Sequence, residues 1–126
     1  MIAVIFEACV PGSARAEYLD LASELRPLLD EIDGFISIER FQSLTSPEKV
    51  LSLSFWRDEA AVAQWRNLPE HRRVQAAGRG HVFANYRLRI AAVARDYGMY
   101  SRTDAPDDSQ TIHGEGPDCV GPRASP

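Results

Sequence analysis

The chain has 126 residues, which is the size of a single domain with a workable core. Its apolar fraction of 44% and charged fraction of 25% are ordinary for a globular protein, and a formal net charge of −4 gives no reason to expect nucleic acid as a partner. The start lacks a basic segment and a cleavage site, and no apolar run approaches the ~20 residues of a membrane span. We therefore expect a soluble cytoplasmic protein without membrane contact. The two cysteines are far apart and match no metal-ligand spacing, so we expect no metal site.

The first predicted elements are a strand and a helix. Residues 2–8 form a short apolar run rich in β-branched side chains, which predicts a strand. After Ser13, which we expect to cap a helix, apolar residues recur at steps of three and four as far as Ile32. Pro27 falls within this pattern, so we expect a kink or a break there. Gly34 suits a left-handed position that ends the helix.

The following elements complete an alternating order. Residues 35–44 and 50–56 predict two strands joined as a hairpin, and Asp58 then caps a second helix. Pro69 suits the first position of a further helical segment, and residues 86–97 alternate as a last strand. The order β-α-β-β-α-β predicts an α+β fold of the ferredoxin-like kind with an antiparallel sheet.

The chain changes character near its end. We expect residues 1–100 to form the domain and residues 101–126 to form a tail, because the latter are rich in Pro, Gly, Asp and Ser and have almost no large apolar side chain. Such a segment buries too little surface to offset its ordering entropy. We therefore expect it to be mobile or to pack on a partner subunit.

Several predicted strands are apolar on both faces. In residues 2–8, Val4 and Phe6 lie on one side and Ile5 on the other, and in residues 50–56 Leu53 opposes Trp56. The helices cover one face, so something must cover the second one. The same face of another copy is the simplest cover, which predicts a homodimer. The alternative is that one or two strands are central and already covered.

Five short motifs follow one another at characteristic positions. They are Gly34-Phe35 at the start of a strand, Phe55-Trp56 just before Asp58-Glu59-Ala60, Trp65 in the second helix, Glu70-His71-Arg72 after it, and Tyr86-Arg87-Leu88 in the last strand. In this order they resemble the antibiotic biosynthesis monooxygenase family, over about residues 1–97. Members of that family are dimeric α+β barrels, so the resemblance implies this assembly here.

The resemblance also implies a pocket between helices and sheet. Some members oxygenate polycyclic aromatic phenols to quinones without metal or flavin, others degrade haem, and others have no established reaction. We therefore predict a cofactor-independent monooxygenase that acts on an aromatic or phenolic small molecule with dioxygen. The alternatives are a non-catalytic dimeric module that binds a small molecule, and a haem-degrading monooxygenase.

Two residues are the predicted catalytic pair. Trp65 matches a tryptophan that the haem-degrading and quinone-forming branches share, and its indole N–H could donate to bound oxygen; the alternative is a core tryptophan. His71 would titrate near neutral pH, so it could be the base for a phenol or a haem ligand. The alternative for His71 is a surface histidine beside Arg72.

Four further residues are predicted to contact the substrate: Phe83, Tyr86, His81 and Glu7. His81 could reach the pocket mouth or be a loop histidine. Glu7 could point into the pocket or into the dimer seam, where a buried carboxylate needs a partner such as Arg89.

The pattern argues against haem as a cofactor. Gln75 stands where the haem-degrading relatives have their ligand histidine, and Glu7 stands where they have an asparagine. We therefore expect no cofactor. Residues 66–95 carry seven arginines against the single acid Glu70, which favours an anionic ligand or, alternatively, a solvated basic face.

Overall fold

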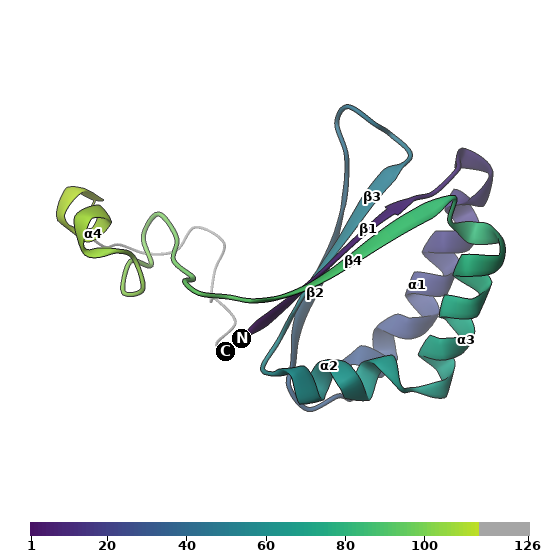
Figure 1. Cartoon of the computed structure of the whole chain (residues 1–126), viewed down its shortest axis with the longest axis horizontal. Coiled ribbons are helices and arrows are strands. Elements are labelled where there is room, and N and C mark those ends of the chain that lie inside the picture. Colours follow the sequence, from purple (N-terminus) through teal and green to yellow (C-terminus); the bar gives the residue numbers. More distant parts are fainter. Residues whose placement is uncertain (114–126) are drawn as a thin grey trace. The chain divides into compact units, whose positions relative to one another are not determined.

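The computed structural model describes residues 1–113, which divide into two compact units. The first unit is a four-stranded sheet with helices on one side (Figure 1). Its elements in chain order are β1 (Ile2–Cys9), α1 (Arg15–Asp30), β2 (Phe35–Gln42), β3 (Lys49–Trp56), α2 (Glu59–Arg66), α3 (Pro69–Ala77) and β4 (Asn85–Ala92). None of the helices in the described part of the chain is long and apolar enough to cross a membrane.

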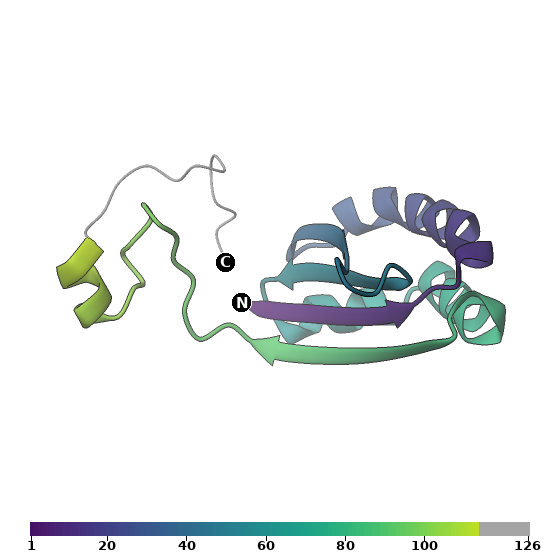
Figure 2. The same cartoon turned by 90° about the horizontal axis from the view of Figure 1, so that it is seen from above.

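The sheet has the strand order β2-β3-β1-β4. β3 pairs antiparallel with both β1 and β2, and β1 and β4 run in opposite directions (Figure 2). The predicted hairpin and the predicted ferredoxin-like antiparallel sheet are both confirmed.

An irregularity in β2 changes which side chains share a face. The register between β2 and β3 shifts between Phe35 and Ser37. As a result Phe35 packs on Trp56 at a centroid distance of 5.2 Å, whereas Phe41 lies on the opposite face and is 43% exposed. Strict alternation along residues 35–41 would place Phe35 and Phe41 on the same face, and the bulge separates them because it resets the alternation along the strand.

The predicted signals at helix ends have mixed outcomes. The Asp58 carboxylate accepts the Ala61 N–H at 2.9 Å, and Pro69 opens α3, as expected. Gly34 has φ 98°, a left-handed value that glycine adopts at no steric cost. Ser13 is not a cap, because a short 3₁₀ turn over Gly12–Ala14 leads into α1. α1 also runs through Pro27 rather than breaking there.

The core of the first unit consists of two separate clusters. One contains Ala8, Val10, Ala14, Tyr18 and Val82, and the other contains Leu29, Ile32, Trp56, Ala61 and Val62. The clusters lie at opposite ends of α1, because Tyr18 belongs to one and Leu29 to the other. A domain of this size usually has one contiguous core, so the division leaves room between the clusters.

The second unit begins at Ala92. The last strand also ends at Ala92, so its predicted extension to residue 97 is wrong. Within this unit the buried Arg102 donates to the Gly98 carbonyl oxygen at 3.1 Å and lies over the Tyr97 ring. Helix α4 (Asp107–His113) forms part of the predicted tail, and residues 114–126 of that tail lie outside the described residues.

Candidate functional site

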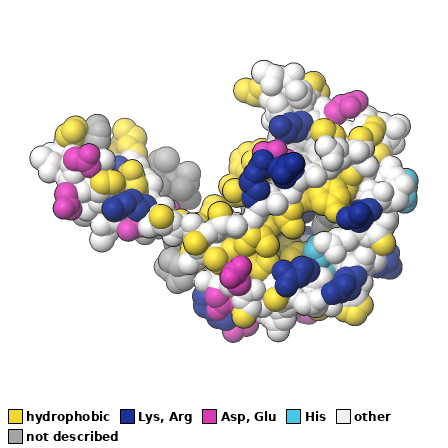
Figure 3. All heavy atoms as spheres, in the orientation of Figure 1, with side chains coloured by type: hydrophobic (Ala, Val, Ile, Leu, Met, Phe, Trp, Pro, Cys, Tyr) yellow, Lys and Arg dark blue, Asp and Glu magenta, His cyan; other side chains and the backbone are white. Residues whose placement is uncertain are grey.

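A cavity of about 250 Å³ lies between the sheet and the helices α1, α2 and α3. Figure 3 shows a hollow with an apolar surface and basic side chains around it. Most of the lining is aliphatic or aromatic. Three arginines and one histidine also line the cavity, but no aspartate or glutamate does: Arg40, Arg66, Arg79 and His71. Such a site suits an apolar ligand that carries negative charge.

The strands supply this lining by alternation. The side chains that line the cavity stand at every second position: Val4 and Phe6 of β1, Ser52, Ser54 and Trp56 of β3, and Tyr86, Leu88 and Ile90 of β4. Successive side chains of a strand point to opposite faces of a sheet. Residues of the other parity, among them Ile5, Leu51, Leu53 and Phe55, therefore form a second surface, which we call the far face.

Trp65 and His71 are stacked at one end of the cavity. Their ring centroids are 4.3 Å apart with an angle of 27° between the planes, and Trp65 lies 6.5 Å from Trp56. The two residues come from different helices, since α2 ends at Arg66 and α3 starts at Pro69. The short connection turns the chain so that His71, in the first turn of α3, faces the indole.

The surroundings of the stacked imidazole disfavour its protonated form. Burial lowers the pKa of His71 below its usual 6.5, and the positive charge of Arg72 acts in the same direction. The backbone groups of Arg66 and Trp65 oppose this shift by favouring the protonated ring. Nδ1 nevertheless makes no hydrogen bond of acceptable geometry with any residue in 1–113. A neutral imidazole can accept a proton, as a general base must.

Two arginine–tyrosine pairs line the other end of the cavity. Arg40 Nε donates to Tyr18 Oη at 3.2 Å, and Arg79 Nη1 donates to Tyr86 Oη at 2.7 Å. Both phenol rings lie edge-on to Phe83, at centroid distances of 5.8 and 6.0 Å. The sequence analysis did not single out Tyr18 or Arg40, because neither stands in a motif. Arg40 could have been found in the sequence as a charged residue at a position of β2 that faces the helices.

Gly78 fixes the position of this aromatic group. It is buried at the start of a π-helical turn (Gly78–Val82), and a Cβ there would lie 2.6 Å from the Phe83 ring. The close approach of backbone and ring therefore requires a residue without a side chain.

The structure brings four of the six predicted site residues together. Trp65, His71, Phe83 and Tyr86 all line the cavity. His81 does not line it: the ring is exposed, and Nε2 lies 2.6 Å from the Glu17 carboxylate of α1.

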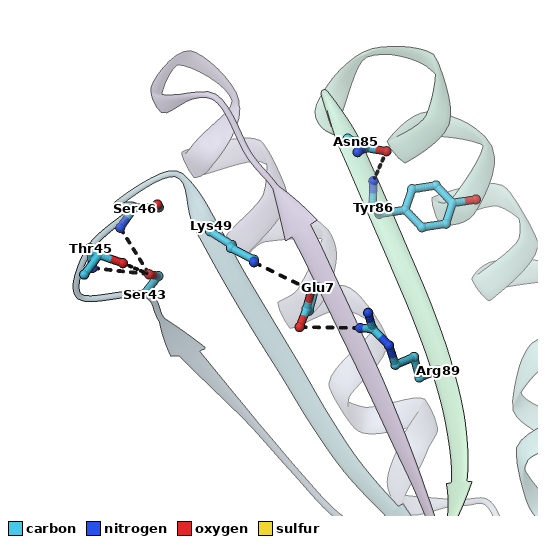
Figure 4. Close-up of polar contacts among 8 residues, drawn as sticks. All are labelled: Glu7, Ser43, Thr45, Ser46, Lys49, Asn85, Tyr86 and Arg89. Atoms are coloured by element: carbon cyan, nitrogen blue, oxygen red, sulfur yellow. Dashed lines mark hydrogen bonds and ion pairs between the residues drawn. The ribbon is translucent and has the colours of Figure 1, made fainter.

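Glu7 belongs to the far face. Its carboxylate lies 3.7 Å from Lys49 Nζ of β3 and 3.5 Å from an Arg89 nitrogen of β4, so that it bridges two neighbouring strands (Figure 4). The expectation that Glu7 contacts a ligand in the pocket is not supported by this position, because its parity in β1 is opposite to that of Phe6. The alternative of pairing with Arg89 is what the structure has.

Comparison with known proteins identifies the family of this chain. The family model for antibiotic biosynthesis monooxygenase matches residues 1–77, which is more than half of the chain. The chain belongs to the antibiotic biosynthesis monooxygenase family. No three His, Cys, Asp or Glu side chains within residues 1–113 are grouped in a way that could hold a metal ion.

One curated relative is similar to this chain in sequence, and two solved structures share its fold. A protein of Pyricularia oryzae named jasmonate monooxygenase is 46% identical over 93 residues, which cover 74% of this chain and 43% of that protein. The chain thus spans less than half the length of that relative. A conserved protein from Methanosarcina mazei has a TM-score of 0.66 at 20% identity, covering 71% of this chain and 89% of that one. Rv0793 from Mycobacterium tuberculosis has a TM-score of 0.68 at 17% identity, covering 77% and 98%.

Proposed function

We propose that this chain is a cofactor-independent monooxygenase that oxidises a small aromatic or phenolic molecule in the cavity between helices and sheet. The observation that carries the proposal is the stacked Trp65–His71 pair in the wall of a largely apolar cavity. Membership of the monooxygenase family supports the reaction class.

The proposed chemistry uses the substrate as its own reductant. His71 accepts the proton of the phenol, and the resulting phenolate gives electrons to dioxygen. A C–O bond forms, and the hydroperoxide then loses water to leave a quinone. One oxygen atom enters the product and the other leaves as water, so no external reductant is needed.

Each residue of the pair has a distinct part in this scheme. A partly buried, neutral His71 is a competent base at neutral pH, because burial keeps its pKa low. Trp65 forms an apolar wall that excludes water from the reacting anion. Its indole N–H makes no hydrogen bond to another described residue, which leaves it free to donate to the reduced oxygen.

The relative from Pyricularia oryzae widens the set of substrates to test. Its name assigns it jasmonate, which is the anion of a small ring-containing carboxylic acid. A cavity whose charged lining residues are all basic suits such an anion as well as a phenolate. Phenols that also carry a carboxylate therefore belong in the same assay, because such molecules can still act as their own reductant.

The proposed assembly is a homodimer formed through the far face. Ile5, Leu51, Leu53 and Phe55 stand on this face, and the helices cover only the opposite one. β4 is exposed along its whole length. An isologous contact between two copies would cover the apolar centre of this face.

The test is oxygen uptake by the purified protein with hydroxylated naphthalenes, both with and without a carboxylate on the ring. We expect uptake with at least one substrate, a strong loss in His71→Ala and Trp65→Ala, and no loss in the matched variant His81→Ala. No uptake above background with any compound would favour a non-catalytic binding module. Activity that survives the double variant would refute the assigned site. A saturable Soret band on addition of haemin, absent in His71→Ala, would favour haem chemistry instead.

A further inference from the structure

The arginines within residues 1–113 differ in their partners. Some of those on the outer surface are paired with carboxylates, for example Arg73 with Glu24 at 3.3 Å and Arg26 with Asp30 at 2.8 Å. Arg40 and Arg79, which line the cavity, make no ion pair with a carboxylate within the described chain, and each donates instead to a tyrosine oxygen. A phenol does not neutralise a guanidinium, so both positive charges remain uncompensated at the cavity wall.

The two arginine–tyrosine pairs occupy the same end of the cavity. Tyr18 and Tyr86 flank a single ring, that of Phe83. Across the sheet, Arg40 and Phe6 both stand opposite Ser52, and Phe6 lies 5.5 Å from Tyr86. The sheet register and the ring contacts thus agree that both guanidinium groups belong to one end.

The Trp65–His71 pair occupies the opposite end. Trp65 lies beside Trp56, which follows Ser52 by four residues along β3. Four residues of an extended strand span ~13 Å. A ligand that reaches both ends of the cavity is therefore about the length of two fused aromatic rings with a substituent at each end.

Each pair retains hydrogen-bond capacity for a ligand. A guanidinium has five N–H donors, and a tyrosine takes up one of them. Because each tyrosine oxygen accepts from an arginine, its own O–H proton is free to be donated. Two guanidinium groups and two phenol protons form a donor set that fits the oxygens of a carboxylate.

We propose that Arg40–Tyr18 and Arg79–Tyr86 bind a carboxylate on the substrate and so direct its oxidisable ring to Trp65 and His71. The second half of this statement rests on the proposed oxygenase function, but the carboxylate site does not. The arginine–tyrosine pairs determine specificity, because a neutral molecule of the same shape leaves both guanidinium groups without an anionic partner.

Binding without turnover tests the carboxylate site separately from the reaction. The probe is a hydroxynaphthoic acid with its hydroxyl and carboxyl groups at opposite ends of the ring system, compared with its methyl ester and with unsubstituted naphthol. Kd is measured by calorimetry under anaerobic conditions, so that no oxidation occurs. We expect the acid to bind about tenfold or more tightly than the ester, since a hydrogen bond to a charged group is worth that much.

The variants locate the effect. Arg40→Gln and Arg79→Gln are each expected to raise the Kd of the acid about tenfold and to leave the Kd of the ester unchanged. Tyr86→Phe is expected to raise the Kd of the acid by a smaller factor. Arg73→Gln is the matched control, because that arginine pairs with Glu24 outside the cavity. Thermal unfolding of every variant shows whether it is folded, and unchanged binding of the ester shows that the cavity is intact.

The outcomes separate this proposal from the oxygenase function. Equal Kd values for acid and ester, no binding of any of the three probes, or an equal loss in Arg73→Gln would overturn the carboxylate site. Oxygen uptake without preference for the acid would remove this proposal and keep the oxygenase. Tighter binding of the acid than of the ester, retained in His71→Ala and without any oxygen uptake, would keep the carboxylate site and remove the oxygenase function.

Discussion

The two faces of the sheet come from the same strands, yet they hold different kinds of side chain. The face toward the helices is hollowed and carries the Trp65–His71 pair at one end and two arginine–tyrosine pairs at the other. The far face has an apolar centre, with Glu7 held between Lys49 and Arg89. Phe6 and Glu7 are adjacent in sequence and lie on opposite faces. The comparison shows that the parity of a residue in its strand decides whether it can meet a ligand.

The largest effect is expected for the helix-facing side, at His71. His71→Ala removes the proposed base, so we expect kcat to fall by roughly 10²–10⁴ in the oxygen-uptake assay. His81→Ala, which alters an exposed histidine paired with Glu17, is the control and is expected to leave kcat unchanged. A similar loss of kcat in both variants would contradict the assignment of His71 as the base, because His81 does not line the cavity.

The stability of the helix-facing side depends on Trp56. This side chain is 1% exposed and joins the second core cluster, so Trp56→Ala is expected to lower the free energy of unfolding by about 3–5 kcal/mol. Leu19→Ala on α1, where the side chain is 48% exposed, is expected to change it by about 0.5 kcal/mol or less. Urea unfolding followed by fluorescence and circular dichroism compares the two, and equal losses would contradict the assignment of this core.

The far face is expected to control assembly. Leu53→Asp places an unpaired charge in the proposed dimer contact and should weaken the dimer by about 2 kcal/mol or more. Leu88→Asp, on the helix-facing side of β4, is the matched control and should leave the assembly unchanged. Sedimentation over a dilution series measures both, and a monomeric wild-type protein would show that the far face has another role.

The pH dependence of turnover follows from the lowered pKa of His71. Because burial keeps the ring neutral, kcat/KM should be flat around neutral pH and fall as the pH drops below 6.5 through the lowered pKa. Below that pKa the loss is about tenfold per pH unit, since a protonated ring accepts no proton. Any residual activity of His71→Gln should not show this decrease of kcat/KM at low pH. The same decrease in that variant would assign the titration to another group.

The smallest effect is expected for the ion pairs of the far face. Glu7 is about one-third exposed, so Glu7→Gln should lower the free energy of unfolding by about 1 kcal/mol or less. It should leave kcat unchanged, because the residue stands on the face away from the cavity. A loss of turnover at unchanged stability would place Glu7 in the site after all.

Local signals in the sequence predicted most of the fold correctly. The cap at Asp58, the left-handed Gly34 and the helix start at Pro69 depend on groups within a few residues, so their chemistry can be read from the chain. Trp65 and His71 were singled out by the family resemblance rather than by local chemistry, and both line the cavity. Ser13 shows the limit of this approach, since a 3₁₀ turn competes with the expected cap.

Tertiary structure decided which polar residues meet. Arg40 and Tyr18 are 22 positions apart and His81 and Glu17 are 64 apart, and no local pattern links either pair. The bulge at Phe35 shifted the parity of β2, which placed Phe41 on the far face. The sequence by itself determined the elements and the family, because these depend on short-range periodicity and motifs. Only the packing of helices on the sheet determined the cavity and its charge, because distant segments contribute each side chain.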